Sequence, residues 1–324
     1  MPSFTEFASA KLNLYLHVTA KRDDGYHVLD SLVAFADVGD RVTVEPGPGL
    51  SLEITGPYAA DVPPGSDNLV LKAAQLLAEH AGVAAHAAIT LEKNLPVASG
   101  IGGGSADAAA TLRALVKLWA LELPDEHIRS AAHQVGHNTD TRRALETLFT
   151  LWRDDLDADM MGAIALELGA DVPVCLEGRT VFMGGIGEDL HLPPPLPTVW
   201  VVLANAGAAL STPAVFQARV GDFSAPARFF EAPGSAADLA RVLGERDNDL
   251  SAPAIALAPA IQDVLDALGR LKGCLLARMS GSGATCFGLF STQDGAHTAA
   301  RDISAQHPDW WVQAAKLSDA APTF

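Results

Sequence analysis

The segment Leu95–Ala110, which reads LPVASGIGGGSADAAA, holds the residue pattern best suited to chemistry in this chain. Its four glycines are Gly100, Gly102, Gly103 and Gly104. Backbone N–H groups can converge on a bulky anion where side chains are missing, and the N-terminus of the helix that follows adds partial positive charge. Ser105 can cap this helix or ligate a metal that is bound to phosphate. The segment therefore predicts a cradle for a polyphosphate.

The glycine segment fits neither of the two common phosphate-binding fingerprints. A Walker A loop ends in Gly-Lys-Ser/Thr, and the chain has no Gly-Lys pair. A dinucleotide-binding loop needs a glycine where this chain has Ser105. The alternative interpretation is a tight turn that needs positive φ, but successive glycines before a helix are costly in chain entropy. We therefore favour phosphate binding over a purely structural turn.

Length and composition are those of an ordinary globular protein. The chain has 324 residues, enough for two domains that each bury a core. No apolar run approaches the length that spans a bilayer, and Glu6 interrupts the stretch where a secretion signal would be apolar. Cys175, Cys274 and Cys286 are far apart and odd in number, so we expect reduced thiols rather than disulfides or a metal site. These features predict a cytoplasmic protein.

The net charge narrows the class of partner. Acidic residues outnumber lysine and arginine by 39 to 22, which gives a formal charge of −17. Nucleic-acid-binding proteins show the opposite balance, and an anionic membrane would repel this chain. We therefore expect a small-molecule ligand, with no nucleic acid and no membrane as partner. If that ligand is a nucleotide, its binding must rely on local donors and a divalent cation.

The residues before the glycine segment predict elements that would hold it in place. Residues 10–18 alternate apolar and polar side chains, as a half-buried strand does. Lys21–Tyr26 contains an Asp-Gly pair that indicates a hairpin turn, and strand-like sequence continues to Val44. We also expect a helix over 68–80, a strand over 87–91 and a helix over 106–119. Strand, loop and helix in this order are the setting that a phosphate cradle needs.

The later part of the chain is predicted to be helical first and then mixed. Residues 124–168 favour helices, and Thr139–Arg153 is amphipathic. Pro173 followed by apolar residues indicates a turn into a buried strand. The proline-rich residues 191–197 are the candidate junction between two domains. Beyond them we expect a strand over 198–207, helices over 236–243 and 260–268, and a second glycine turn within 277–290.

Four segments, in order along nearly the whole chain, resemble the motifs of the GHMP small-molecule kinases. They are AKLNLYLHVTAKRDDGYHVLDS (Ala10–Ser31), LPVASGIGGGSADAA (Leu95–Ala109), LGADVPVCL (Leu168–Leu176) and ARMSGSGATCFG (Ala277–Gly288). The resemblance implies an α+β, two-domain GHMP kinase fold, with a mixed or antiparallel sheet packed with helices in each domain and the active site in the cleft between them. We place the N-terminal domain at 1–180, with a helical insertion near 130–160, and the C-terminal domain at 181–324.

The sequences KLNL, RDDGYH and GADVP resemble one member of this family in particular. The resemblance implies transfer of the γ-phosphoryl group of ATP to the 2-hydroxyl of the methylerythritol part of a cytidyl diphosphate alcohol, in non-mevalonate isoprenoid precursor synthesis. Phosphoryl transfer needs alignment, neutralisation of charge and a group that accepts the hydroxyl proton. The resemblance makes Asp171 that base, with Lys11 beside it to favour the developing alkoxide. Taken singly, Asp171 could be a turn carboxylate and Lys11 a charge at a strand edge.

The resemblance also assigns residues to the alcohol substrate. Asn13 would orient it, Tyr26 would stack on the cytosine ring, and His27 would meet the polar edge of that ring. Phe216 would stack on the opposite face of the base, or would instead pack in the core.

A longer set of residues is implied for ATP and Mg²⁺. These are Asn68, Lys93, Pro96, Val97, Ala98, Ser99, Gly100, Ile101, Gly102, Gly103, Gly104, Ser105, Gly281, Ser282 and Gly283. Asn68 and 93–96 would form the adenine pocket, 100–105 would hold the phosphates, and Ser105 could contact Mg²⁺. The turn 281–283 would close the site or form an ordinary hairpin.

Two features depart from the family pattern. Ser99 stands where the family more often has Gly or Ala, and residues 130–160 make the connection before GADVP longer than expected. His133 and His137 in this insertion are spaced as metal ligands could be. Gln134 replaces the glutamate of the zinc-protease pattern and no third ligand is evident, so surface histidines are the better interpretation. The amphipathic helix could pack on the body or form a subunit contact, so we expect a monomer or a weak homodimer.

Two other functions stay open at this point. One is a different GHMP kinase that acts on a mevalonate-type or homoserine-type alcohol, although the Tyr26–His27 pair argues for a substrate with a base. The other is a catalytically silent nucleotide-binding homologue, against which Lys11 and Asp171 both argue.

Overall fold

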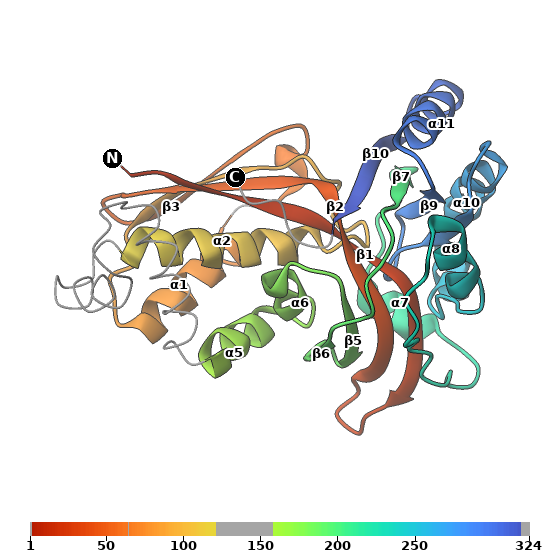
Figure 1. Cartoon of the computed structure of the whole chain (residues 1–324). Coiled ribbons are helices and arrows are strands. Elements are labelled where there is room, and N and C mark those ends of the chain that lie inside the picture. Colours follow the sequence, from red (N-terminus) through yellow and green to blue (C-terminus); the bar gives the residue numbers. More distant parts are fainter. Residues whose placement is uncertain (1, 64, 121–157, 319–324) are drawn as a thin grey trace, which may run out of the picture.

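A computed structural model describes residues 2–63, 65–120 and 158–318 of the chain. The described residues form an α+β structure around one ten-stranded sheet, as expected for this fold class (Figure 1). The strands are β1 (Phe4–Lys21), β2 (His27–Glu45), β3 (Leu50–Thr55), β4 (Ala87–Glu92), β5 (Val181–Gly185), β6 (Asp189–His191), β7 (Trp200–Asn205), β8 (Leu276–Met279), β9 (Cys286–Phe290) and β10 (Trp311–Ser318). The helices are η1 (Ala59–Asp61), α1 (Leu69–Ala81), α2 (Gly103–Ala120), α5 (Ala158–Leu168), α6 (Val172–Glu177), α7 (Thr212–Ala218), α8 (Ala236–Gly244), α9 (Ser251–Leu257), α10 (Ala260–Arg270) and α11 (Gln293–Gln306).

The sheet runs through both halves of the molecule. Its order is β3-β4-β2-β10-β7-β9-β8, and β1 and β5 also pair with β2 outside this path. The pair β3 and β4 is parallel, whereas β1 and β2 form a long antiparallel hairpin. Among the described residues, β10 meets β2 through Leu317 opposite Ala36 and Ser318 opposite Phe35. This short contact joins the two parts of the sheet.

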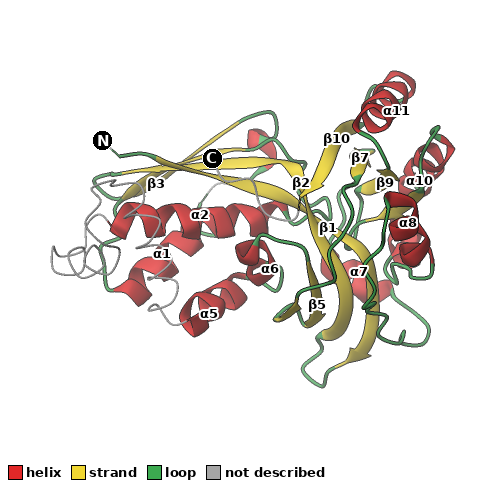
Figure 2. Cartoon of the chain, viewed as in Figure 1, coloured by secondary structure: helices red, strands yellow, loops and turns green. Residues whose placement is uncertain are grey.

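Helices cover the sheet separately in the two halves. Figure 2 shows α1, α2, α5 and α6 together on one side of the long N-terminal strands, and apolar residues of these helices and strands share one core cluster. A second cluster lies in the C-terminal half, where α9, α10 and α11 pack on the shorter strands. A third cluster contains residues of both halves, including Leu12 and Leu14 of β1, Leu203 of β7 and Phe287 of β9. The hairpin of β1 and β2 is therefore common to both halves.

Strand β1 is more buried than its alternating sequence predicts. The alternation predicts a strand with one face in water, but residues 7–18 are almost all buried on both faces. The polar side chains of Lys11 and Asn13 are buried, and both residues line a cavity between elements of the fold. The Asp-Gly turn is as predicted, since Lys21 pairs with His27 across the hairpin.

The residues around Pro173 form a helix, so the predicted strand is wrong. Helix α6 carries Pro173 in its first turn, where the missing N–H costs nothing because it would have no helical partner. Gly178 ends the helix in the left-handed conformation, with φ of 65°, and its N–H donates to the carbonyl of Val174. A short apolar run does not distinguish a buried helix from a buried strand.

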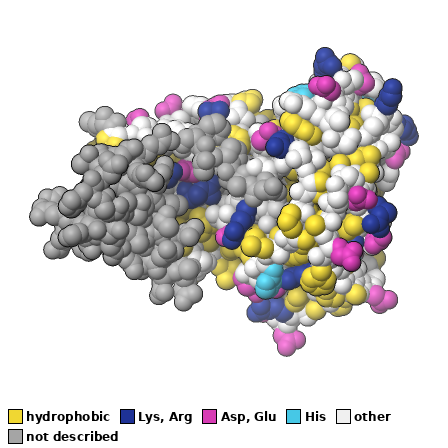
Figure 3. All heavy atoms as spheres, viewed as in Figure 1, with side chains coloured by type: hydrophobic (Ala, Val, Ile, Leu, Met, Phe, Trp, Pro, Cys, Tyr) yellow, Lys and Arg dark blue, Asp and Glu magenta, His cyan; other side chains and the backbone are white. Residues whose placement is uncertain are grey.

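The remaining predictions on the fold concern the domain boundary, the insertion, membrane spans, the cysteines and the surface charge. The boundary at 180/181 stays a prediction, and the insertion with His133, Gln134 and His137 lies outside the described residues. In the described part of the chain, no helix is both long and apolar enough to cross a bilayer. The three cysteines are free. On the face in Figure 3, acidic and basic side chains are scattered over the C-terminal half, with apolar side chains between them.

Candidate active site

A cavity of about 1410 Å³ lies where the hairpin, the glycine segment, α6 and α7 come together. Most of the residues predicted for the site line it: Lys11, Asn13, Tyr26, His27, Asn68, Lys93, Pro96, Val97, Ala98, Ser99, Gly100, Gly102, Gly103, Gly104, Ser105, Asp171, Phe216, Gly281 and Ser282. Ile101 does not line the cavity, because its side chain is fully buried in the core. Gly283 packs behind the cavity wall, against Gly100. The structure thus gathers segments from residue 11 to residue 282 around one space.

The glycine segment forms a loop that lies directly on β1. Lys11 N–H donates to the carbonyl oxygen of Ile101 at 2.9 Å. A Cβ atom on Gly102 would stand 3.1 Å from Cβ and Cε of Lys11, so a larger residue would crowd the lysine. Helix α2 starts at Gly103, and the first N–H groups of a helix have no partner within it. Ser105 lies in the first turn of α2 and is not its cap, which corrects one of the two roles that the sequence suggested.

The second glycine turn supports the first from behind. A Cβ atom on Gly100 would stand 2.5 Å from the carbonyl oxygen of Gly283, and φ of Gly100 is +75°. Ser280 Oγ donates to the carbonyl of Gly100 at 3.1 Å. Thr285 N–H donates to the carbonyl of Ser99 at 3.0 Å. The C-terminal half therefore supports the loop through two hydrogen bonds and through the close approach of Gly283, which leaves no room for a Cβ atom on Gly100.

An ion pair lies beside this loop. Lys11 Nζ is 2.8 Å from Asp171 Oδ1, and the side chains are 4% and 41% exposed. Asp171 precedes α6 but makes no side-chain hydrogen bond that caps this helix. The carboxylate therefore faces the lysine and the cavity, and it does not cap the helix that follows. The predicted proximity of Lys11 and Asp171 is present in the structure.

Asn13 holds the lysine in place. Its Oδ1 accepts a hydrogen bond from Lys11 Nζ at 3.1 Å, and its Nδ2 donates to Ser31 Oγ at 2.8 Å. Ser31 Oγ in turn donates to the carbonyl of Tyr15. Asn13 is fully buried, so this chain of hydrogen bonds defines its orientation.

Aromatic residues mark another part of the cavity wall. The rings of His27 and Phe216 are stacked, with centroids 4.8 Å apart and an interplanar angle of 20°. Phe216 also packs against the C-terminal core, and its stacking on a base stays a prediction. Tyr26 is 57% exposed at the hairpin turn. Burial lowers the pKa of His27, as do the charges of Lys21 and Arg219, so this ring is neutral at neutral pH.

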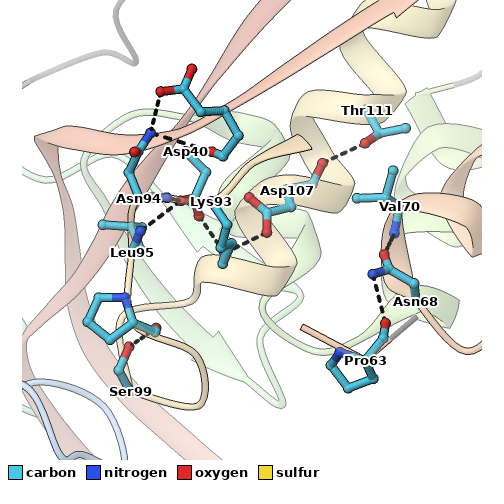
Figure 4. Close-up of polar contacts among 12 residues, drawn as sticks. Asp40, Pro63, Asn68, Val70, Lys93, Asn94, Leu95, Ser99, Asp107 and Thr111 are labelled. Carbon is cyan, nitrogen blue, oxygen red and sulfur yellow. Dashed lines mark hydrogen bonds and ion pairs between the residues drawn. The ribbon is translucent and has the colours of Figure 1, made fainter. Parts of the chain in front are cut away.

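Asn68 is a structural residue as well as a lining residue. Its Oδ1 accepts a hydrogen bond from the Val70 N–H at 2.9 Å and so caps α1. Its Nδ2 donates to the carbonyl of Pro63 (Figure 4). Ser99 Oγ donates to the carbonyl of Pro96 at 2.6 Å, which closes the first turn of the glycine loop. These contacts shape the cavity wall next to the glycine loop.

Two carboxylates that the sequence analysis missed enclose the ammonium group of Lys93, and the predicted place of this residue in an adenine pocket stays a prediction. Lys93 Nζ donates to Asp40 Oδ2 and to Asp107 Oδ2, the latter at 2.7 Å (Figure 4). Burial raises the pKa of Asp107 to about 8, and the charge of Lys93 opposes this shift. The one available signal was a lone carboxylate among the alanines of SADAAA.

Comparison with known proteins agrees with this arrangement. The family model for the GHMP kinases N terminal domain matches residues 68–144, and the model for the GHMP kinases C terminal domain matches residues 229–309. A homoserine kinase from Cytophaga hutchinsonii has the same fold, with a TM-score of 0.65 at 17% identity over 100% of this chain and 97% of that one. The fold and the site define the class: an ATP-dependent small-molecule kinase of the GHMP type.

More similar proteins narrow this class. The 4-diphosphocytidyl-2-C-methyl-D-erythritol kinase of Cereibacter sphaeroides is 50% identical over 96% of this chain and 98% of its own length. That of Paramagnetospirillum magneticum is 48% identical over 98% and 99%. A crystal structure of 4-(cytidine 5'-diphospho)-2C-methyl-D-erythritol kinase superposes with a TM-score of 0.70 at 34% identity, covering 97% of this chain and 99% of that one. The chain belongs to the 4-diphosphocytidyl-2-C-methyl-D-erythritol kinase family.

Proposed function

We propose that this protein transfers the γ-phosphoryl group of ATP to the 2-hydroxyl of 4-diphosphocytidyl-2-C-methyl-D-erythritol, giving the 2-phosphate and ADP. The observation that carries the proposal is the Lys11–Asp171 pair, with Nζ and Oδ1 2.8 Å apart, against a glycine loop at a helix start. The names of relatives that match nearly the full chain support the choice of alcohol.

The glycine loop binds the triphosphate in this proposal. Free N–H groups at the start of α2 point toward an anion, and the helix dipole favours negative charge there. Gly100, Gly102, Gly103 and Gly104 let the phosphates approach the backbone closely, and Ser105 adds a hydroxyl.

Asp171 accepts the proton in the transfer step. The hydroxyl proton of the alcohol passes to the Asp171 carboxylate as the alcohol oxygen bonds to the γ-phosphorus, and the bond to the β-phosphate oxygen breaks to release ADP. Lys11 stabilises the negative charge that develops on the oxygen, and Asn13 keeps its ammonium group oriented. Lys11 also keeps Asp171 beside the loop through the ion pair.

The residues at the hairpin turn select the cytidyl group. Exposed Tyr26 offers a face for the cytosine, and the neutral imidazole of His27 offers both a donor and an acceptor to its polar edge. Phe216 backs the imidazole at 4.8 Å and defines the second wall. A mevalonate-type or homoserine-type alcohol would leave these side chains without a base to contact.

The site also fits Mg²⁺ carried by ATP. In the part of the chain that the structure describes, no three His, Cys, Asp or Glu side chains are grouped as a metal centre. Mg²⁺ in kinases is usually held by substrate phosphates, water and one or two protein oxygens. Ser105 would supply one of those oxygens, and the ion would neutralise phosphate charge. The three free cysteines support a cytoplasmic location.

A coupled assay of ADP release tests the proposed substrate. The purified protein receives Mg-ATP and one of four alcohols: the cytidyl diphosphate alcohol, methylerythritol 4-phosphate, mevalonate or homoserine. We expect turnover with the first alcohol at a kcat/KM at least 100-fold above that of the others. Comparable turnover with methylerythritol 4-phosphate would show that the aromatic residues do not select the cytidyl group. Preference for mevalonate or homoserine would refute the proposed substrate.

A further inference from the structure

A buried network of ionisable residues lies directly behind the glycine loop. Asp40 comes from β2, Lys93 follows β4, and Asp107 lies near the start of α2. The three side chains are at most 5% exposed. Lys93 donates to both carboxylates, so one ammonium group joins two strands and a helix (Figure 4).

Asp40 holds the residues that lead into the loop. Its Oδ1 accepts hydrogen bonds from the N–H groups of Asn94 at 2.5 Å and Leu95 at 2.8 Å. These residues immediately precede Pro96, at which the cavity-lining part of the loop starts. The N-terminal end of the loop is therefore attached to β2 by one carboxylate.

Asp107 attaches the other end of the loop to the same ammonium group. Its Oδ2 is 2.7 Å from Lys93 Nζ. Lys93 Nζ also lies close behind the first helical residue, because a Cβ atom on Gly103 would stand 3.1 Å from it. A shift of this group would therefore displace the N–H groups at the start of α2.

Stability alone does not account for such a network. Burying charged groups costs free energy, and well-packed apolar residues of similar volume are often equally stable or more so. Asp107 Oδ1 has no hydrogen-bond partner in the described structure, which adds to the cost. The network costs free energy but connects both ends of the proposed ligand-binding loop. Its presence is therefore better explained by the loop geometry that it imposes.

We propose that Asp40, Lys93 and Asp107 are positioning residues for the nucleotide, which act by fixing the two ends of the loop Pro96–Ser105. In this proposal they act on the nucleotide through the shape of the loop, and the Lys93 ammonium group is held by the two carboxylates. The inference rests on the nucleotide half of the proposed function and is independent of the choice of alcohol.

The test measures binding of Mg²⁺ with a non-hydrolysable ATP analogue by calorimetry, without any alcohol. The double variant Asp40→Asn/Lys93→Met removes the ion pair together with the ammonium group that Asp107 contacts. The new amide oxygen can still accept from the N–H groups of Asn94 and Leu95. We expect its nucleotide Kd to rise at least tenfold. The matched control is Lys117→Met, which removes the ion pair to Glu6 near the far end of the same helix. We expect the control to stay within twofold of the parent.

Asp107 supplies a second test that does not depend on the folding of the double variant. Asp107→Ala removes one arm of the network, and we expect about a fivefold rise in nucleotide Kd, with Asp107→Asn restoring the parent value within twofold. In steady state, KM for ATP should rise in Asp107→Ala while KM for the alcohol stays within twofold. Parent-like nucleotide affinity in Asp107→Ala would overturn the proposal, as would an equal loss for both substrates. A wrong choice of alcohol would leave the calorimetric result intact.

Discussion

Replacing Asp107 with asparagine should change how the stability of the protein depends on pH. Burial raises the pKa of Asp107 to about 8 in the folded protein, whereas an unfolded aspartate titrates near 3.9. Between these values the folded state holds one proton more than the unfolded state. The free energy of unfolding therefore falls as pH rises, by up to about 1.4 kcal/mol per pH unit, and the loss is complete above the folded pKa.

Asparagine has nearly the same shape as the protonated carboxyl group and carries no proton to lose. It can still accept from Lys93 through its amide oxygen. The stability of Asp107→Asn relative to the parent should therefore rise by about 2 to 3 kcal/mol between pH 5 and pH 7. Because other titrating groups are common to both proteins, their contributions cancel in this difference.

Urea unfolding followed by circular dichroism at pH 5, 6 and 7 measures the effect. The control is Asp266→Asn, an exposed carboxylate on α10 that pairs with Arg270. Its difference from the parent should stay within about 0.5 kcal/mol across the range. A difference between Asp107→Asn and the parent that is constant with pH would show that Asp107 is ionised in the folded protein, and the reasoning on its burial would be wrong.

Further predictions concern other parts of the site. Gly100→Ala should lower the thermal unfolding midpoint and weaken ATP binding, because the alanine Cβ atom would stand 2.5 Å from the carbonyl oxygen of Gly283. Parent-like ATP affinity by calorimetry would contradict this prediction. Tyr26→Ala should raise Kd for the cytidyl substrate about 5- to 150-fold through lost stacking and leave Kd for ATP within twofold, and an equal loss for both would make Tyr26 structural. Burial raises the pKa of Cys175 to about 12 and raises that of Cys286, so both should react with iodoacetamide at pH 8 far more slowly in native than in urea-unfolded protein, as measured by mass spectrometry.

Local signals predicted much of the fold. The helix predicted over 68–80 is present as α1 (Leu69–Ala81), with Asn68 as its cap rather than its first residue. The Asp-Gly pair predicts the turn between β1 and β2, which the structure contains. Pro173 shows the limit, because a proline before a short apolar run suits a helix start as well as a turn into a strand. Only the packing of Val172, Val174 and Cys175 against the N-terminal core selects the helix.

The site was predictable where motifs are contiguous and not where it depends on distant pairing. The glycine loop is one uninterrupted segment, so the phosphate-binding role proposed for it rests on local sequence. The proximity of Lys11 and Asp171, 160 residues apart, came from the family resemblance and not from spacing. The enclosure of Lys93 was missed, because its only signal was the lone Asp107 carboxylate among alanines. Asp40 is a single carboxylate within a strand that meets the loop only after folding.

The most direct test of the reaction chemistry is the turnover of Asp171→Asn with Mg-ATP and the cytidyl diphosphate alcohol. Asparagine preserves the shape and the position beside Lys11 but cannot take up the hydroxyl proton. General-base help is typically worth about 10²- to 10⁴-fold in rate. We predict a fall in kcat of this size, with the calorimetric Kd for the ATP analogue within threefold of the parent. Turnover at the parent rate would contradict the assignment of Asp171 as the base.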